Sequence, residues 1–305
     1  MGGRLWKIAG RTIDVGRHGM IMGVLNVTPD SFSDEGEFFS LDKAVARGLQ
    51  IAAEGARIVD VGGESTRPGA EPVSVEEELR RVIPVIEKLR REMSAAVNAQ
   101  RSTSNAQPSI EIGTATNSKF ISIDTSKPEV ASAALDAGAS IVNDVTGGSG
   151  DDKILALIAK RKAAFIIMHM QGNPRTMQVA PHYVDVVSEV ADFFRQQYAR
   201  AIECGVDPMA IAFDPGIGFG KTLEHNLELL GNLERLRVEN RPIAVGVSRK
   251  SFLGKLIGTS EMRERLAAGV ALTSLLRSRG AELFRVHDVK ENVDALRVTE
   301  AILEH

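Results

Sequence analysis

The sequence predicts an α/β protein: a (β/α)₈ TIM barrel with an N-terminal β-hairpin. Eight short apolar runs alternate with helical patterns along the chain, as in a parallel sheet. The runs are apolar throughout instead of alternating with polar residues, which is typical of strands covered on both faces. The 305 residues suit one such domain, with the barrel spanning residues 19–305. An open doubly wound sheet is the alternative.

The expected elements follow one another in a regular order. The N-terminal stretch RLWKIAGRTIDVG, with Gly10 near its centre, predicts a small hairpin that could close the barrel floor. The expected strands begin at Met20, Ala56, Lys119, Ser140, Ala163, Met209, Pro242 and Glu282. Helical spacing is clear in Leu41–Ala52, Leu79–Leu89 and Val187–Tyr198. Pro84 predicts a kink in the second of these helices.

One segment, residues 94–118, departs from the alternation. It is rich in Ser, Thr, Asn and Ala and has little apolar content, so we expect a flexible insertion. It follows a helix and precedes a strand, and such connections lie at the face of a barrel away from the chemistry. The insertion is therefore expected to be dispensable for activity.

Composition excludes several classes of function. A net charge of −3 and a pI near 6.1 give no electrostatic reason to expect nucleic acid as a partner. The single cysteine, Cys204, can form neither an internal disulfide nor a thiolate metal site. No stretch approaches the roughly 20 apolar residues that span a bilayer. We therefore expect a cytoplasmic protein with no membrane partner.

Polar residues gather where the predicted strands end, which is where barrel enzymes carry their active sites. They are Asn26, Asp124, Asn143, Asp144, His169, Asp214, Ser248, Arg249, Lys250, Arg285 and His287. A polar side chain at the end of a buried strand is costly unless it has a partner or a ligand. A whole ring of them at one face indicates a binding site.

The residue types in this ring suggest a substrate. Asp124, Asp214 and the amide of Asn143 could bind a planar heterocycle with several N–H groups, such as the guanidine-like edge of a pterin. Arg67, Arg285 and His287 are cationic donors of the kind that hold phosphate groups. Asn26 offers a hard oxygen for Mg²⁺ carried in by a diphosphate. Together they predict a heterocyclic diphosphate as substrate.

Eight phrases resemble the dihydropteroate synthases in their order and in their strand positions. They are NVTPDSFSD, GGESTRPGA, SIDTSKPEVA, IVNDVTGG, MHMQGNP, DPGIGFGK, VGVSRKSF and RVHDV. The resemblance runs from about Met20 to the end, except in the insertion. It implies a pterin-binding transferase of folate biosynthesis. This enzyme would condense 6-hydroxymethyl-7,8-dihydropterin diphosphate with p-aminobenzoate, giving 7,8-dihydropteroate and diphosphate.

The resemblance also implies a role for particular residues. Catalysis would depend on Asp124, Lys250 and Arg285. The pterin would be bound by Asp124, Asn143, Met168, Asp214 and Lys250. Asn26, Arg285 and His287 would hold the diphosphate, with Asn26 also on Mg²⁺. The p-aminobenzoate pocket would be framed by Phe32, Thr66, Arg67, Pro68, Phe219 and Ser251. Asp124 would stabilise the positive charge that develops on the pterin methylene as diphosphate leaves. A homodimer and a sulfonamide target are further implications.

Each of these residues also has an ordinary structural interpretation. Asp124 could cap a helix, Asp214 could form an Asx turn, and Lys250 could be a solvated lysine. Asn26 and Arg67 could be turn residues, and Phe32 and Phe219 could be core aromatics. His169 is interpreted as structural, and Cys204 as a helix-face residue without chemistry.

Other functions remain as alternatives. The phrase PGIGFGKT nearly matches a phosphate-binding loop, but Pro215 replaces its first glycine. A barrel methyltransferase that uses a folate would share the pterin contacts but needs no diphosphate site. A catalytically silent pterin-binding protein would have lost Asp124, Lys250 or Arg285, and all three are present.

Overall fold

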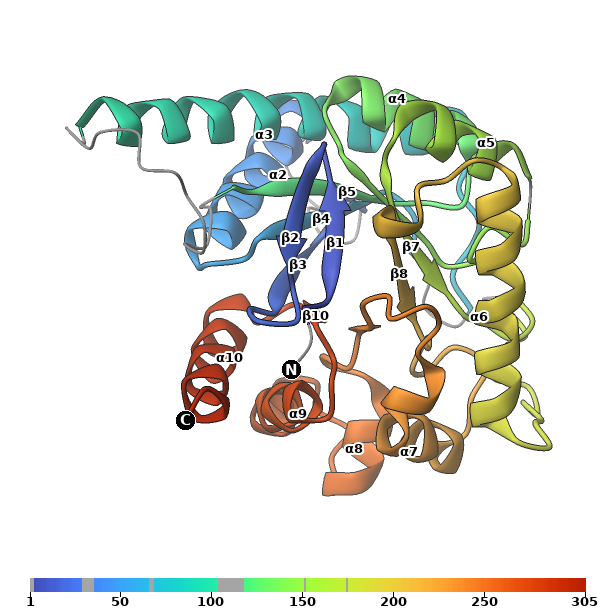
Figure 1. Cartoon of the computed structure of the whole chain (residues 1–305). Coiled ribbons are helices and arrows are strands. Elements are labelled where there is room, and N and C mark those ends of the chain that lie inside the picture. Colours follow the sequence, from blue (N-terminus) through green and yellow to red (C-terminus); the bar gives the residue numbers. More distant parts are fainter. Residues whose placement is uncertain (1–2, 29–35, 66–68, 104–117, 151, 174) are drawn as a thin grey trace.

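The computed structural model describes residues 3–28, 36–65, 69–103, 118–150, 152–173 and 175–305. In this part of the chain, helices surround a sheet of eight parallel strands (Figure 1). The strands are β3 (Met20–Asn26), β4 (Ile58–Gly62), β5 (Phe120–Asp124), β6 (Ile141–Asp144), β7 (Ala164–Met168), β8 (Ile211–Asp214), β9 (Ala244–Val245) and β10 (Leu283–Val286).

The sheet curls until its two edges meet. Its strand order is β8-β7-β6-β5-β4-β3-β10-β9, and an isolated parallel bridge between Phe213 and Ile243 joins the edge strands β8 and β9. The amide of Phe213 donates to the carbonyl of Pro242 at 2.9 Å across this seam. The predicted TIM barrel is confirmed, and the open-sheet alternative is wrong. Each predicted apolar run contains one strand, although β9 has only two residues in regular pairing.

Helices connect successive strands and cover the outside of the barrel (Figure 1). They are α2 (Gly36–Ala53), α3 (Val75–Thr103), α4 (Pro128–Ala137), α5 (Asp152–Arg161), α6 (Val186–Glu203), α7 (Leu223–Gly231), α8 (Ser251–Ile257), α9 (Leu266–Ser278) and α10 (Val289–Leu303). Short 3₁₀ turns lie at Pro208–Ala210, Leu233–Leu236 and Arg263–Arg265. No helix in the described ranges has both the length and the apolar character needed to cross a membrane.

Helix α3 corrects the predicted extent of the insertion. It continues from Val75 through Pro84 to Thr103, so residues 94–103 are helical rather than loop. Alanine, glutamine and methionine are good helix formers, and they extend the helix beyond the stretch that packs on the barrel. In Figure 1 this end of α3 extends past the barrel. Residues 104–117, the rest of the predicted insertion, lie outside the described residues.

The predicted N-terminal hairpin is also confirmed. Strands β1 (Leu5–Ile8) and β2 (Arg11–Asp14) pair antiparallel, and Ala9 and Gly10 turn between them with φ values of 49° and 75°. Positive φ at both turn positions matches the twist of a tight hairpin. Trp6 is fully buried, and its indole Nε1 donates to the carbonyl of Ala210 at 2.9 Å. The hairpin is thus tied to the start of β8.

Residues two apart on a strand point to the same side of the sheet. The side that faces into the barrel is apolar at its lower end and polar at its upper end. The lower layer is apolar and packs with Trp6, Ile8 and Val15 of the hairpin region; it includes Met20, Met22, Ile58, Phe120, Ile141, Ile166, Ala212, Ala244 and Leu283. Two residues further along four of these strands, the side chains that point into the barrel are those of Asp60, Asn143, Asp214 and Arg285. The apolar floor therefore lies directly beneath a polar layer at the carboxyl ends of the strands.

Candidate active site

Polar residues at the strand ends lie next to one another because the neighbouring strands pair in register. Asn26 pairs with Gly62, Gly62 pairs with Asp124, and Asp124 pairs with Asn143 across β3, β4, β5 and β6. At Gly62, a Cβ atom would lie 3.5 Å from the Cβ of Asp124, so glycine leaves open space beside that carboxylate. The register brings three of the predicted site residues to one level of the barrel.

Arg285 on β10 bonds to acidic residues of both β4 and β5, a link that the sequence analysis did not predict. Its Nε donates to Oδ2 of Asp60 at 2.7 Å, and its Nη2 donates to Oδ2 of Asp124 at 2.7 Å. Asn143 Nδ2 also donates to Oδ2 of Asp60, at 3.4 Å. The Asp60 side chain is fully buried, whereas 24% of the Arg285 side chain remains exposed. About a quarter of the Arg285 side chain therefore stays accessible.

The electrostatics of this cluster make Asp124 unusual. Burial raises the pKa of Asp124 to about 7; Arg285 opposes this shift, and Asp60, Glu78 and Asp144 add to it. Burial alone would lower the pKa of Arg285, but Asp60 and Asp124 outweigh it and raise the pKa. Arg285 is therefore a permanent cation, while Asp124 gains and loses its proton near neutral pH.

A second group lies at the ends of β8 and β9. Lys250 Nζ donates to the carbonyl of Ile217 and lies 4.4 Å from the centre of the Phe219 ring. A Cβ atom on Gly246 would lie 3.8 Å from Lys250 Nζ and 4.0 Å from Oδ2 of Asp214, so both side chains lie beside Gly246. Burial lowers the pKa of Lys250 to about 8, although the Asp214 carboxylate raises it. Burial also raises the pKa of Asp214, against the pull of Lys250.

Met168 adds an apolar wall to this group. It is buried at the end of β7 and pairs in register with Asp214. The predicted pterin residues Asp124, Asn143, Met168, Asp214 and Lys250 thus all line the upper part of the barrel. The structure brings these five residues to the carboxyl ends of the strands.

The remaining described site residues lie at the rim. His287 is held by Ser248, whose hydroxyl oxygen accepts from the His287 backbone N–H at 3.2 Å and lies 3.3 Å from Nδ1. Ser251 is exposed at the first position of α8, directly after Lys250. Asn26 is half-buried at the end of β3. Phe32, Thr66, Arg67 and Pro68, together with the 29–35 segment, lie outside the described residues, and the predictions on them stay predictions.

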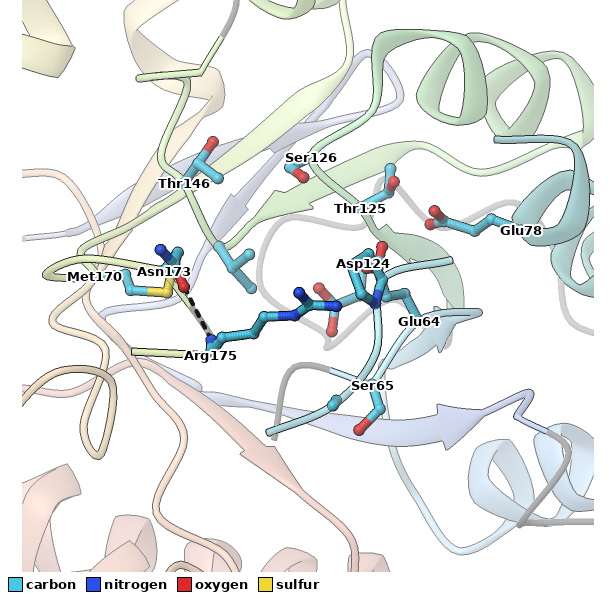
Figure 2. A pocket seen from close by; sticks show the side chains of 13 residues that line it. Glu64, Ser65, Glu78, Asp124, Thr125, Ser126, Thr146, Met170, Asn173 and Arg175 are labelled. Carbon is cyan, nitrogen blue, oxygen red and sulfur yellow. Dashed lines mark hydrogen bonds between the residues drawn. The ribbon is translucent and has the colours of Figure 1, made fainter. Parts of the chain in front are cut away.

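A cavity of about 350 Å³ opens on one side of Asp124. Its polar lining includes Ser126 and Thr146, which follow β5 and β6, and Glu64, which follows β4. Figure 2 shows Arg175 extending from the loop after β7 toward Asp124 and Glu64. Arg175 also forms an ion pair with Glu71. The cavity gives Asp124 an approach from the loops above β4 to β7.

The structure separates the functional from the structural interpretations. Asp124 does not cap α4, whose N-cap is Lys127 without a side-chain cap bond. Lys250 is not a freely solvated lysine, given its contacts with Ile217 and Phe219. Asp214 does form an Asx turn, since Oδ1 accepts from the amide of Gly216 at 2.7 Å, while Oδ2 lies beside Gly246, as Lys250 Nζ does. An Asx turn and a ligand contact are compatible, because each uses a different oxygen.

His169 and Lys221 resolve two other interpretations. His169 Nδ1 lies 3.0 Å from Lys221 Nζ, and burial lowers the pKa of His169 to about 3, which agrees with its interpretation as a structural residue. Lys221 belongs to the PGIGFGKT phrase, and its side chain is buried against protein acceptors rather than open to a phosphate. Lys221 is therefore not placed to bind a phosphate, and the structure does not support the phosphate-binding-loop alternative.

Sequence reasoning missed Asp60 and Lys221. Asp60 is the only acidic residue in the apolar run ARIVDVGG, and an isolated acid in a buried strand is itself a signal of a buried partner. The partner is Arg285, which lies 225 residues away from Asp60 in the chain. The local sequence pattern around Asp60 could not identify it. Among the described residues, no group of three or more His, Cys, Asp or Glu side chains could hold a metal ion by itself.

Comparison with known proteins shows which proteins this chain is similar to. A family model described as "Pterin binding enzyme" matches residues 22–100 and 91–287. The dihydropteroate synthase of Escherichia coli strain K12 is 45% identical over 294 residues, covering 96% of this chain and 95% of its own length.

Two solved structures of dihydropteroate synthase from Xanthomonas albilineans are also similar over their whole length. The one with 4-aminobenzoic acid has a TM-score of 0.84 and 42% identity, and covers 99% of both chains. The one in complex with 7,8-dihydropteroate has a TM-score of 0.81 and 40% identity, and also covers 99% of both chains.

Proposed function

This chain belongs to the dihydropteroate synthases, a family of pterin-binding enzymes, and we propose that the polar layer of its barrel is the catalytic site. The enzyme is a transferase of folate biosynthesis that condenses 6-hydroxymethyl-7,8-dihydropterin diphosphate with p-aminobenzoate. The products are 7,8-dihydropteroate and diphosphate. The observation that carries the site assignment is the Asp60–Arg285–Asp124 cluster above an apolar barrel floor.

The pterin ring is proposed to lie between the two groups of polar residues. Asp214 would accept N–H bonds from the guanidine-like edge of the pterin through Oδ2, and Asn143 would contact the ring from β6. Lys250 would donate to the carbonyl side of the ring, and Met168 would pack on its face. The depth of the polar layer supports this assignment, because a planar ring entering from the carboxyl ends of the strands meets these side chains before the apolar floor.

Asp124 is proposed to stabilise the cation that forms when the C–O bond to diphosphate breaks. The amine nitrogen of p-aminobenzoate then forms the new C–N bond and loses one proton to solvent or to the leaving diphosphate. A carboxylate aimed at the developing positive charge helps the transition state more than the ground state. The accessible part of Arg285 would contact the diphosphate while its Nη2 holds Asp124.

Mg²⁺ is a proposed cofactor, with Asn26 as its protein ligand. The donor chemistry fits, since an amide oxygen is a hard ligand and Mg²⁺ usually keeps several waters and few protein ligands. A bound Mg²⁺ would supply positive charge to the leaving diphosphate. His287, held in place by Ser248, would donate to the same diphosphate beside Arg285.

The p-aminobenzoate pocket is proposed to lie at the rim, between Phe219 and Ser251. Phe219 lies under the Lys250 ammonium, and Ser251 starts the next helix. Phe32, Thr66, Arg67 and Pro68 would complete the pocket from the first two loops after β3 and β4. Sulfonamides resemble p-aminobenzoate, so this pocket is also where we propose that they compete.

A homodimer in the cytoplasm is proposed as the working form. Helices α9 and α10 pack side by side (Figure 1) and expose Leu275, Val298 and Ile302, which are 44%, 62% and 70% accessible. Apolar groups on adjacent helices favour association with a second copy. Sedimentation should show a dimer that the double variant Val298→Glu/Ile302→Glu converts to a folded monomer. A wild-type monomer would contradict the proposal.

The function is tested by one reaction. Purified protein is mixed with the pterin diphosphate, p-aminobenzoate and Mg²⁺, and diphosphate release is followed. We expect release that requires p-aminobenzoate and yields 7,8-dihydropteroate. Absence of release, or release at the same rate without p-aminobenzoate, would reject the assignment.

A further inference from the structure

Lys221 is a buried lysine that the proposed chemistry does not use. Only 3% of the residue is exposed. Its Nζ lies 2.9 Å from the carbonyl oxygen of Phe219, 3.0 Å from Nδ1 of His169 and 3.4 Å from the carbonyl oxygen of His169. An ammonium has three N–H donors and no acceptor, so these three contacts match its hydrogen-bonding capacity. Such a costly burial calls for a reason beyond packing.

We propose that Lys221 and His169 form a positioning pair for the pterin site: the pair fixes the loop after β8 and holds it against the strand end that carries Asp214, whose carbonyl accepts from the His169 amide. This inference rests on the proposed function, since it concerns the same pterin site. Neither residue needs to touch the substrate. Both would act through Asp214, Lys250 and Phe219, which are proposed to contact it.

The loop that follows β8, residues 215–222, depends on external hydrogen bonds for its shape. Gly216 has a φ of 63°, and a Cβ there would lie 1.9 Å from the carbonyl oxygen of His169. The loop therefore packs backbone to backbone against the end of β7. Lys221 bonds across this contact to both segments, to Phe219 on the loop and to His169 after β7.

Other side chains hold the same loop, which makes its position well defined. Asn226 accepts from the amide of Gly218 at 2.7 Å, and Tyr183 donates to the carbonyl of Gly220 at 2.9 Å. The loop presents the Ile217 carbonyl and the Phe219 ring to Lys250. A shift of the loop would therefore move the Lys250 ammonium.

The charge of Lys221 also bears on Asp214. His169 is neutral, because burial, followed by the nearby Lys221, lowers its pKa to about 3, so its Nδ1 can accept from the ammonium. Burial and Lys250 lower the pKa of Lys221 well below its ordinary value, while Asp214 raises it. Lys221 in turn lowers the pKa of Asp214, in the same direction as Lys250 and Arg285. A charged Lys221 therefore favours the ionised form of Asp214.

Tyr183 is a further titratable group beside the Lys221–His169 pair. The Tyr183 ring centre lies 6.1 Å from that of His169 and 4.9 Å from that of His225, and burial raises the pKa of Tyr183 above its ordinary value. Tyr183 is therefore neutral near pH 7. The charges that act on Asp214 are thus those of Lys250, Arg285 and Lys221.

Three variants test the pair. Lys221→Met removes the ammonium and keeps the length of the side chain. His169→Leu removes the acceptor at Nδ1, and His169→Asn keeps an acceptor oxygen close to that position. Lys255→Met, at an exposed lysine of α8, serves as a control. Each protein is titrated with 6-hydroxymethylpterin by calorimetry across a range of pH, and its turnover is measured at saturating pterin.

We expect Lys221→Met and His169→Leu to raise the pterin Kd about tenfold, the size of one lost buried hydrogen bond to a charged group. The turnover number at saturating pterin should fall much less. In Lys221→Met the pKa of Asp214 rises further, so the loss of affinity with falling pH should begin at a higher pH than in the wild type. His169→Asn should recover most of the affinity.

The inference is overturned if Lys221→Met is folded but binds pterin like the wild type with the same pH profile. If Lys221→Met does not fold, the two His169 variants decide: equal Kd values for His169→Leu and His169→Asn would also overturn it. A wild-type protein that fails to bind pterin or to release diphosphate would instead reject the proposed function. The two failures are thus distinguishable.

Discussion

Asp124 shares a hydrogen bond with Arg285, with 2.7 Å between Oδ2 and Nη2. The two residues lie 161 positions apart in the chain and meet inside the barrel. A carboxylate in this position is costly to ionise, and the arginine compensates only in part, so the pKa of Asp124 remains near 7. The pair therefore couples the proposed cation-stabilising group to the proposed diphosphate-binding group.

The pH profile of catalysis should reflect this pKa. Burial raises the pKa of Asp124 to about 7, and only the carboxylate can stabilise a cation. As pH falls through about 7, Asp124 gains a proton, and kcat/KM should fall. Burial lowers the pKa of Lys250 to about 8, so its charge is lost as pH rises through about 8, and kcat/KM should fall again. A profile that is flat from acidic to alkaline pH would contradict both roles.

Lys250→Met should isolate the alkaline side of that profile. The methionine keeps the apolar stem but loses the ammonium that bonds to the Ile217 carbonyl and faces Phe219. We expect the KM for the pterin diphosphate to rise by at least about tenfold, from the loss of a charged hydrogen bond. The alkaline fall in kcat/KM near pH 8 should disappear. Steady-state kinetics of Lys255→Met, which changes an exposed lysine on α8, should match the wild type.

Asp60→Ala should cost stability as well as activity. Asp60 is fully buried and is one of two carboxylates that hold Arg285. Removing one partner of a buried ion pair typically costs about 3–5 kcal/mol, because the other charge stays buried. The free energy of unfolding is measured in urea. The matched control is Glu71→Ala, which removes an exposed partner of Arg175 and should cost no more than about 1 kcal/mol. Equal losses in the two variants would refute the proposed role of Asp60.

Shortening residues 97–115 should leave catalysis largely intact. The segment lies in the chain between α3, which ends at Thr103, and β5, which begins at Phe120 and has Asp124 at its other end. Connections that lead from a helix into the start of a strand do not carry the chemistry of barrel enzymes. The shortened protein is compared with the full chain in kcat/KM and in thermal unfolding. A large fall in turnover with an unchanged unfolding temperature would show that the segment serves the active site.

Much of the fold could be predicted because its signals are local. Continuous apolar runs such as MIMGVLN and FISID mark strands buried on both faces. The polar residues that end these runs predicted a polar cluster at one face, since parallel strands bring their carboxyl ends together. Asn26, Asp124 and Asn143 therefore came together as expected.

What could not be predicted depends on contacts between distant segments. Asp60 is an acidic residue inside an apolar strand, and only the closed barrel shows that Arg285 is its partner. Lys221 looked like part of a phosphate-binding phrase, but its partner His169 comes from another strand end. The boundary of α3 was also misplaced, because helix propensity in residues 94–103 outweighed their polar composition. Local composition does not reveal these pairings.

The central claim is that Asp124 stabilises a cation in the transition state, and a single-turnover experiment on Asp124→Asn tests it most directly. Asparagine keeps the size of the side chain and can still bond to Arg285, so the pterin diphosphate should bind with similar affinity. The rate of the chemical step should fall by about 10²–10³-fold, as when an electrostatic group is removed from a transition state. A single-turnover rate close to that of the wild type, with the fold retained, would contradict the account.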